Sequence, residues 1–378
     1  MKKIGILTFH KSINYGSVLQ AFALRKALDK LGYNTEVIDY QPDNYDYLYG
    51  LLRKPRSLYG VKYNLVNILH CRLLNNRKRL FAEFREKYLH LSSEKYRYGN
   101  DVSEIADIYD AVICGSDQIW NPKAKDSDIN YYLPIPHKAK KISYAVSLND
   151  GFAGEYKDPE KIKELLADFD YLSVRELPAK EELEKFIGEK DRVKVVIDPS
   201  LLLDPSDYDP ICAERRVDKP YIFLYSVHHN PTTVRAAQIL SQRLDMPVFF
   251  LYTDINSYKT EWKHKDFCCP KKNTSPKEFI SFIKNASLVV TDSFHGTAFS
   301  VVFEKPFFSI LKTDENGKSV RDKRIFDLLN RFDLTSRYIS EEEAARVDLN
   351  EKIDYTSVNM KRKKSVSESL EYLKEAIG

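Results

Sequence analysis

The chain has 378 residues, of which 43% are hydrophobic and only 13 are glycine. The apolar fraction is sufficient for packed cores, which excludes wholesale disorder, and the absence of G-x-G-x-x-G and G-x-x-x-x-G-K-[ST] excludes the two commonest glycine-rich nucleotide cradles. The 59 basic and 55 acidic residues nearly balance, and the net charge of +4 indicates no nucleic-acid partner.

No apolar run approaches the roughly 18 residues of a membrane span. The apolar start of the chain is cut short by His10 and Lys11, and no small-residue cleavage site follows, so it does not resemble a secretory signal. We therefore expect a cytoplasmic protein, with the inner face of the membrane as a second option.

The cysteines and histidines give no sign of a metal. The five cysteines are odd in number and irregular in spacing, and they contain no C-x-x-C pattern. Cys268 and Cys269 are adjacent, and we favour ordinary thiols over a redox pair. Because the histidines also lack metal-ligand spacing, we expect neither a metal nor a cofactor.

The chain begins with alternating strand and helix patterns. Residues 3–9 form a short apolar run, residues 18–31 carry apolar side chains at helical spacing, and residues 34–40 have the pattern of the next strand. A strand, a helix and a strand in this order predict a parallel unit with a right-handed crossover.

An irregular segment, 43–105, interrupts this pattern. It is aromatic and basic, and we interpret it as a helical insertion in a first α/β domain that spans 1–205. The remaining expected strands of this domain are 111–114, 141–146, 171–174 and 193–197, and its expected helices include 62–73, 77–89, 155–169 and 178–187.

A second α/β domain is expected over 206–350, followed by a charged helical tail over 351–378. Ligands of such sheets bind beyond the carboxyl ends of the strands, and with two domains the cleft between them is the expected site. The expected strands of the second domain are 221–225, 247–252, 288–291 and 307–311, and its expected helices are 231–244, 276–285 and 297–303.

The loop HKSINYGS, residues 10–17, follows the first strand. Asn14 and Ser17 suit the cap of the next helix, and Gly16 permits a ligand to approach the backbone. A helix N-terminus can bind an anion, but an ordinary capped turn fits the same residues equally well.

A second loop, GSDQIWNP, contains Asp117, Gln118, Trp120 and Asn121 directly after a strand. Carboxylate and amide groups suit sugar hydroxyls, and an indole suits the apolar face of a sugar ring. We favour this binding role over the alternative, in which Asp117 caps a helix and Trp120 fills the core.

Two further strand ends carry a charged residue. A single arginine is usually a surface or ion-pair residue, but Arg175, in SVRE, follows an apolar strand and suits bidentate recognition of a carboxylate or phosphate. The segment IDPS, at 197–200, we interpret as a structural turn because the residue before a proline avoids the helical conformation.

The segment VTDSFHGTAFS places His295 where a strand passes into a helix. A single histidine is more often structural, but this one follows a polar run, and Gly296 beside it lets the backbone open toward a ligand. Thr297 suits the helix cap, and histidine suits proton transfer near neutral pH.

Arg321 and Arg324 precede a later helix. They fit either the solvated basic start of that helix or a site that binds an anion.

Together, these segments resemble the polysaccharide pyruvyl transferase family. The resemblance runs in order from about residue 4 to residue 337 and rests on HKSINYGSVLQAFAL, CGSDQIWNP, YAVSLN, SVRE, VIDPSLLL and TDSFHGTAFSVVFEKPF. It implies two Rossmann-like domains facing a cleft, as in GT-B glycosyltransferases, with the acceptor on the first domain and the donor on the second.

The activity that this resemblance implies is transfer of the enolpyruvyl group of phosphoenolpyruvate onto sugar hydroxyls. The product is a pyruvate ketal in a capsule, exopolysaccharide or other surface polymer, or in its precursor, and phosphate is released. The partners are therefore phosphoenolpyruvate as co-substrate and a saccharide acceptor, free or lipid-linked. Peripheral membrane association through basic residues of 43–105 is a further option.

The resemblance also implies roles for single residues. His295 is the expected acid/base, with Asp117 or Asp292 orienting it or deprotonating a hydroxyl. The expected donor contacts are Arg175, Ser293, Gly296, Thr297, Arg321 and Arg324. The expected acceptor contacts are Asn14, Tyr15, Gly16, Ser17, Gln118, Trp120 and Asn121.

One position departs from the family pattern. Many relatives have an arginine two residues before the histidine, and here that position is Ser293. Arg321 or Arg324 is expected to supply the charge instead. Two other classes of function stay open: a GT-B glycosyltransferase with a nucleotide-sugar donor, and a saccharide-binding protein without catalysis.

Overall fold

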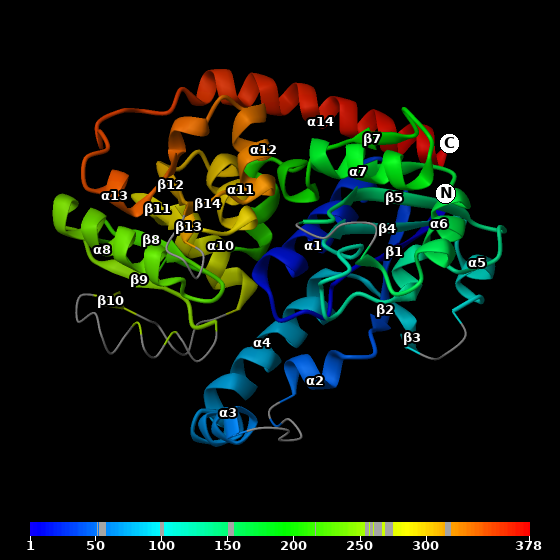
Figure 1. Cartoon of the computed structure of the whole chain (residues 1–378), viewed down its shortest axis with the longest axis horizontal. Coiled ribbons are helices and arrows are strands. Elements are labelled where there is room, and N and C mark those ends of the chain that lie inside the picture. Colours follow the sequence, from blue (N-terminus) through cyan, green and yellow to red (C-terminus); the bar gives the residue numbers. More distant parts are fainter. Residues whose placement is uncertain are drawn as a thin grey trace. The chain divides into compact units, whose positions relative to one another are not determined.

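The computed structural model describes residues 1–50, 52, 58–98, 102–149, 155–215, 217–253, 257, 260, 267–268, 275–313 and 319–378. These residues form two units, each with its own parallel sheet (Figure 1). Unit 1 comprises Met1–Leu203 together with Lys364–Gly378, and unit 2 comprises Asp204–Lys363.

The sheet of unit 1 has seven parallel strands in the order β3-β2-β1-β4-β5-β6-β7. The order reverses between β1 and β4, as in a Rossmann fold. The strands are β1 (Lys3–Leu7), β2 (Asn34–Gln41), β3 (Leu91–Arg97), β4 (Ala111–Asp117), β5 (Lys140–Val146), β6 (Leu172–Val174) and β7 (Val193–Val195).

Helices connect these strands. The connection between β2 and β3 is extended by α3 and α4, and α3 lies at the end of α4 remote from the sheet (Figure 1). The helical segments of unit 1 are α1 (Tyr15–Lys30), α2 (Tyr45–Tyr49), α3 (Leu58–Leu69), α4 (Cys71–Tyr88), α5 (Ile105–Ile108), η1 (Ile129–Tyr132), α6 (Pro159–Ala167), α7 (Leu177–Ile187) and η3 (Pro199–Leu201).

The main sheet of unit 2 has the same plan, with the order β10-β9-β8-β11-β12-β15 and its reversal between β8 and β11. Its strands are β8 (Ile222–Tyr225), β9 (Val248–Phe250), β10 (Phe267–Cys268), β11 (Leu288–Thr291), β12 (Phe307–Ile310) and β15 (Tyr338–Ile339), beside a small antiparallel pair, β13 (Lys312–Thr313) and β14 (Ser319–Val320).

The helices of unit 2 begin with clear caps. Ser275 and Glu278 form a capping box at the start of α10, and Asn230 caps α8. The helical segments are η4 (Pro205–Ile211), α8 (Pro231–Leu244), α10 (Pro276–Asn285), α11 (Phe294–Val302), α12 (Lys323–Arg331), η5 (Thr335–Arg337), α13 (Glu341–Ala344) and the start of α14 (Tyr355–Ile377).

The expected α/β class with two Rossmann-like domains is confirmed by these two sheets. Strands β4, β8, β11 and β12 are buried along their whole length because parallel strands are covered on both faces, and their sequences are mostly apolar. None of the described helices combines the length and apolar character that a membrane-spanning helix needs.

The segment 43–105 contains a strand that the sequence analysis did not predict. Strand β3 pairs with β2, from Val37 opposite Leu91 to Gln41 opposite Arg97. Only two of its seven residues, Ser92 and Tyr96, are buried. Because an edge strand of this kind lacks a hydrophobic pattern, its sequence resembles a loop.

The last helix is shared between the units, whereas the sequence predicts a separate helical tail over 351–378. The end of α14 belongs to unit 1, where the Tyr372 hydroxyl donates to the Ser143 carbonyl at 2.9 Å. The Ile197 amide donates to the Ser369 hydroxyl at 3.0 Å, and Leu373 is fully buried. The C-terminal residues therefore complete the core of unit 1.

Replacing Leu373 by alanine should destabilise unit 1. We expect a loss of about 2–5 kcal/mol in its unfolding free energy because a buried leucine leaves a cavity. Hydrogen exchange should rise in β5 and β6 but not in β8 and β11. The matched control is Leu177→Ala at a half-exposed position, and equal exchange in both variants would contradict the shared role of α14.

Candidate functional site

In unit 1 the carboxyl ends of β1 and β4 are joined by polar side chains. The Thr8 hydroxyl donates to the Ser116 carbonyl at 3.2 Å. Gln20 of α1 donates to Thr8 Oγ1 at 2.8 Å and accepts from the Ser116 amide at 3.2 Å. The loops at the reversal of strand order, where ligands of such sheets bind, are thus held in one arrangement.

Asp117 ends β4 and faces the first turn of α1. Its backbone has a φ of 74°, and its carboxylate accepts from the Ser17 hydroxyl at 2.6 Å. Asn14 is the N-cap of α1 and accepts from the Gly16 amide at 2.9 Å. The structure therefore brings together Asp117 and the predicted loop Asn14–Ser17, with Ser17 on the carboxylate rather than in the cap.

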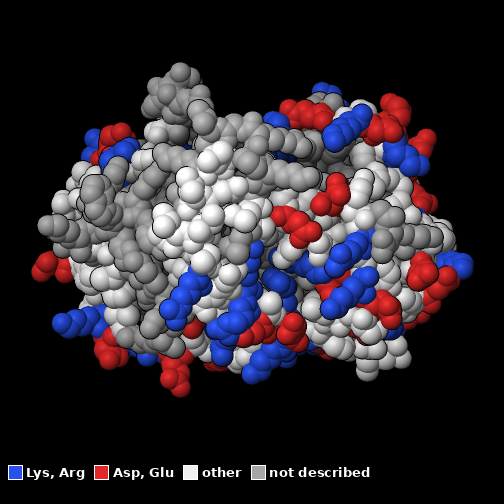
Figure 2. Space-filling model, turned by 90° about the horizontal axis from the view of Figure 1, so that it is seen from below, with Lys and Arg blue, Asp and Glu red and all other residues white. Residues whose placement is uncertain are grey.

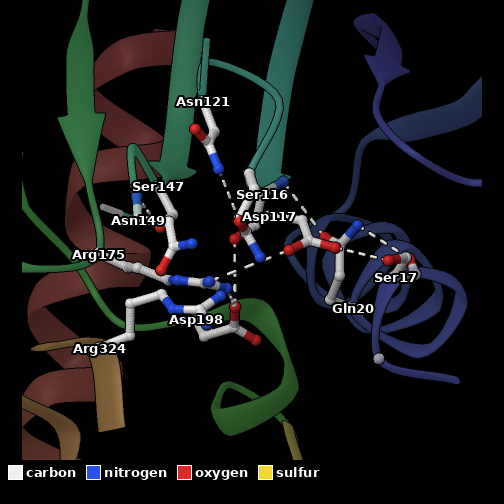
Figure 3. A network of polar contacts seen from close by, with 12 residues as sticks. Ser17, Gln20, Ser116, Asp117, Asn121, Ser147, Asn149, Arg175, Asp198 and Arg324 are labelled. Atoms are coloured by element: carbon white, nitrogen blue, oxygen red, sulfur yellow. Dashed lines mark hydrogen bonds and ion pairs between the residues drawn. The ribbon is translucent and has the colours of Figure 1, made fainter. Parts of the chain in front are cut away.

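Arg175, directly after β6, is the centre of a buried ionic network (Figure 3). Its side chain is 1% exposed and donates to Glu176 at 2.6 Å and to Asp198 at 2.8 Å, and Asp117 lies 3.9 Å away. Burial alone would lower the pKa of Arg175, but the three carboxylates raise it above its usual value. Asp198 also accepts from the Ser116 hydroxyl at 3.2 Å.

This geometry corrects the expected role of Arg175 as a donor-binding cation. Its charge is already compensated by three carboxylates of the same unit, so it positions the ends of β4, β6 and β7. The sequence predicts a simple turn at Asp198. The ion pair of Asp198 with Arg175 is not predictable from the sequence because the two residues lie on different loops.

Asn149 is a further polar residue that the sequence analysis did not select. It follows β5 with a φ of 54°, and its Oδ1 is buried and accepts no hydrogen bond within the described part of the chain. A buried acceptor of this kind is costly unless a ligand or water donates to it. Its only signal in the sequence is its place in YAVSLN, directly after a strand.

Trp120 and Tyr15 are core residues, and their predicted contact with a sugar is wrong. Trp120 is fully buried, stacks on Tyr132 with centroids 5.4 Å apart, and donates from Nε1 to the Tyr131 carbonyl at 2.9 Å. The Tyr15 ring is fully buried against Phe81. Neither ring offers a face to a ligand.

The rest of the GSDQIWNP loop forms a turn. Asn121 is buried, donates to Gln118 Oε1 at 2.9 Å, and accepts from the Lys123 amide at 3.0 Å. Asn121 thus holds the turn, while Gln118 stays partly exposed. The acceptor role of Gln118 remains a prediction.

A second polar cluster in unit 1 lies beside β1 and β2. His10 Nε2 lies 3.3 Å from Asp39 Oδ1 in a fully buried position, and Lys11 Nζ lies 2.8 Å from the same oxygen. Burial by itself would raise the pKa of Asp39, but hydrogen bonds and charge from His10 and Lys11 hold it well below its usual range. The pair is not predictable from the sequence because His10 lies in the loop after β1 and Asp39 lies on β2.

In unit 2 the reversal of strand order is held by Asp292, directly after β11. Its carboxylate accepts from the Ser226 hydroxyl at 2.8 Å and from the Thr233 hydroxyl at 3.0 Å. Among the described residues no hydrogen bond joins it to His295. Asp292 therefore links the ends of β8 and β11 to α8, and its predicted role of orienting His295 is not what the geometry shows.

His295 is the second residue of α11 and is 7% exposed. Its ring meets the Phe294 ring edge to face at 5.3 Å. Ser293 is the N-cap, and its side chain makes no capping hydrogen bond. The first turn of α11 thus offers backbone amides and a partial positive charge beside an imidazole, which suits an anion.

Helix α11 begins at Phe294, three residues earlier than the sequence analysis predicted. Thr297 is consequently inside the helix, fully buried, and hydrogen-bonded to the Ser309 hydroxyl at 2.7 Å, so its predicted capping role is wrong. A Cβ on Gly296 would lie 2.2 Å from Thr291 Oγ1. Gly296 is therefore needed for close packing of α11 on β11, rather than for opening the backbone.

Arg321 and Arg324 are the residues expected to replace the missing family cation. They differ in whether the guanidinium is already paired with a carboxylate. Arg324 makes a bidentate pair with Asp322, at 3.0 and 2.6 Å, and is mostly buried. Arg321 is exposed, with its guanidinium carbon 4.4 Å from the Phe326 ring centroid, and it makes no ion pair with a described residue. Arg321 is thus the cation that is free to meet a ligand.

No group of three metal-ligating side chains occurs in the part of the chain that the structure describes. His229 is held by hydroxyls, with Ser257 Oγ at 2.9 Å and Thr260 Oγ1 at 3.1 Å. This histidine is therefore structural. Cys269, the second member of the adjacent pair, lies outside the described residues.

Replacing Arg175 by alanine should cost about 3–5 kcal/mol of unfolding free energy in urea, without any ligand present, because the carboxylates are left buried and unpaired. The exposed pair of Arg235 and Glu341 provides the control. Arg235→Ala should cost less than about 1 kcal/mol. An Arg175→Ala variant as stable as that control would return Arg175 to the role of a ligand-binding residue.

Replacing Gly296 by alanine should destabilise unit 2 by about 1–3 kcal/mol, because the added methyl group overlaps Thr291. The check is thermal unfolding without ligand. A variant with unchanged stability and reduced ligand binding would instead support the original interpretation, in which this glycine opens the backbone toward a ligand.

A family model described as polysaccharide pyruvyl transferase matches residues 14–311. No curated protein sequence matches the chain significantly. Among solved structures, the chain is similar to UDP-GlcNAc 2-epimerases from Methanocaldococcus jannaschii (14% identity, TM-score 0.49, 97% of this chain and 99% of that chain) and Neisseria meningitidis (11%, 0.47, 98% and 99%). It is also similar to the heptosyltransferase WaaC of E. coli (11%, 0.39, 86% and 96%). With TM-scores below 0.5, the assignment of the fold rests on the two sheets.

Proposed function

Because the chain belongs to the polysaccharide pyruvyl transferase family, we propose that it transfers the enolpyruvyl group of phosphoenolpyruvate to a saccharide. The observation that carries this proposal is the position of His295 in the first turn of α11, next to the reversal of strand order in unit 2. A small anionic donor needs an anion site and a proton donor together, and this helix N-terminus supplies both.

The donor is proposed to bind at unit 2 through the backbone amides at the start of α11 and through a guanidinium that makes no ion pair with a described residue. Backbone amides of α11 suit the phosphate, and the exposed guanidinium of Arg321 suits a carboxylate or phosphate oxygen. Ser293, in the place of the family's arginine, contributes no charge. Arg321 therefore takes the role that the family gives to the missing cation.

The proposed reaction begins with protonation of the donor's methylene carbon by His295. This step leaves an oxocarbenium-like centre at C2, which a sugar hydroxyl attacks while losing its proton. The bond from C2 to the phosphate oxygen then breaks, and phosphate leaves with the electron pair. A second hydroxyl adds to C2 and loses its proton, which closes the ketal. Of the two hydroxyl protons, one restores His295 and the other goes to the released phosphate. Positive groups near the phosphate stabilise the charge that collects on it.

The acceptor is proposed to be a saccharide that binds at unit 1. Gln118 and Asn149 are polar side chains at the carboxyl edge of that sheet, and hydroxyl groups of a sugar can donate to the buried Asn149 Oδ1. The polar carboxyl edge of unit 1 contains three carboxylates around a single guanidinium, so the network is formally negative and suits a neutral ligand better than an anion.

The test is incubation of the purified chain with phosphoenolpyruvate and saccharide fractions of the organism's surface polymer or its lipid-linked precursor. We expect phosphate release and a product with the mass of a pyruvate ketal. Transfer from a nucleotide sugar, with no phosphate release from phosphoenolpyruvate, would establish the glycosyltransferase alternative.

His295→Ala should lower turnover by roughly 10²- to 10⁴-fold, the range for loss of a general acid–base group, while circular dichroism and melting temperature stay close to those of the unmodified chain. The control is His137→Ala, at an exposed position in unit 1. If His295→Ala retains full turnover, or if ligand binding occurs without any turnover in the unmodified chain, the proposed catalytic role is wrong.

A further inference from the structure

Helix α3 presents an apolar face to solvent. Its exposed side chains are Val61 (44%), Leu65 (58%), Ile68 (54%) and Leu69 (78%). Residues spaced by three or four lie on one face of a helix, so these four form a single stripe, which we call the α3 stripe. An exposed apolar stripe of this kind marks an interaction surface.

Among the side chains of α3 that the structure describes, the apolar ones face outward, whereas an ordinary surface helix buries its apolar face. Its polar residue Asn67 is 7% exposed, while Leu65 and Ile68 on either side of it point outward. The next helix, α4, buries the apolar side chains of Phe81 and Phe84, as an ordinary surface helix does. The outward face of α3 is therefore not a general property of this part of unit 1.

The α3 stripe lies on a strongly basic part of the chain. From residue 58 to residue 82 the sequence contains five Lys and Arg residues and no Asp or Glu, so this segment alone exceeds the net charge of +4 of the whole chain. Arg72 and Arg79 of α4 are exposed, and Arg79 is ion-paired with Glu83 of the same helix. Figure 2, seen from the side on which α3 lies in Figure 1, shows uncharged side chains in white over this helix.

We propose that the α3 stripe docks on an anionic lipid bilayer. A bilayer offers an apolar layer for Leu65, Ile68 and Leu69 and negative headgroups for the neighbouring arginines. The helix has 12 residues, which at about 1.5 Å per residue gives roughly 18 Å. This is much less than the roughly 30 Å of a hydrocarbon core, so α3 lies in the interface and does not cross it.

A second copy of the chain fits this surface less well. A two-fold interface brings the same patch of both copies together, and here it would oppose two segments that each carry a net positive charge. An anionic bilayer has the opposite sign. Charge complementarity therefore selects the membrane as the occupant.

The test is flotation of the full chain with vesicles of phosphatidylglycerol and phosphatidylcholine, and with vesicles of phosphatidylcholine alone. We expect binding to the anionic vesicles that falls at high salt, and at least a tenfold loss of binding in the variant Leu65→Glu/Leu69→Glu. The matched control is Leu177→Glu, at an exposed leucine of α7. It should bind like the unmodified chain.

Because the mutated side chains are exposed, the variant should keep its melting temperature. Failure of the unmodified chain to bind anionic vesicles, or equal binding by the α3 variant, overturns the proposal. A dimer in light scattering that dissociates in the α3 variant assigns the stripe to a second copy instead. Vesicle binding needs no turnover, so the result does not depend on the proposed pyruvyl transfer.

Discussion

The reversal of strand order in each sheet is the constraint from which the candidate site follows. At this point the crossover connections leave in opposite directions, and the carboxyl ends of two neighbouring strands stay open. In unit 1 these are the ends of β1 and β4, joined by Thr8 and Ser116. In unit 2 they are the ends of β8 and β11, joined by Ser226 and Asp292. Residues far apart in the sequence meet there because the carboxyl ends of parallel strands lie at one edge of the sheet.

The carboxyl edges of the two sheets differ in the charge of their side chains. In unit 1 the guanidinium of Arg175 is surrounded by three carboxylates, so this network is formally negative and disfavours an anion. In unit 2 the carboxylate of Asp292 is held by neutral hydroxyls, and cationic character comes from the start of α11 and from Arg321. This asymmetry agrees with the proposal of an anionic donor at unit 2 and a neutral saccharide at unit 1.

Most of the fold could be predicted from the sequence, since buried parallel strands are continuous apolar runs and amphipathic helices repeat every three or four residues. Strand β3 could not, because an edge strand with two buried residues has no such pattern. The loops that carry polar residues were predicted, but not the partner of each side chain. Trp120 follows a strand as a ligand-binding residue would, and only the tertiary structure shows that its ring is buried against Tyr132.

The central claim is that the donor binds where β8 and β11 end, at the start of α11. The most direct measurement is hydrogen exchange of the chain with and without saturating phosphoenolpyruvate. The account predicts increased protection of the amides in 293–297 and in the neighbouring loop 226–233, which contains the start of α8. Protection confined to the carboxyl edge of unit 1, or no protection in either unit at saturating donor, would contradict it.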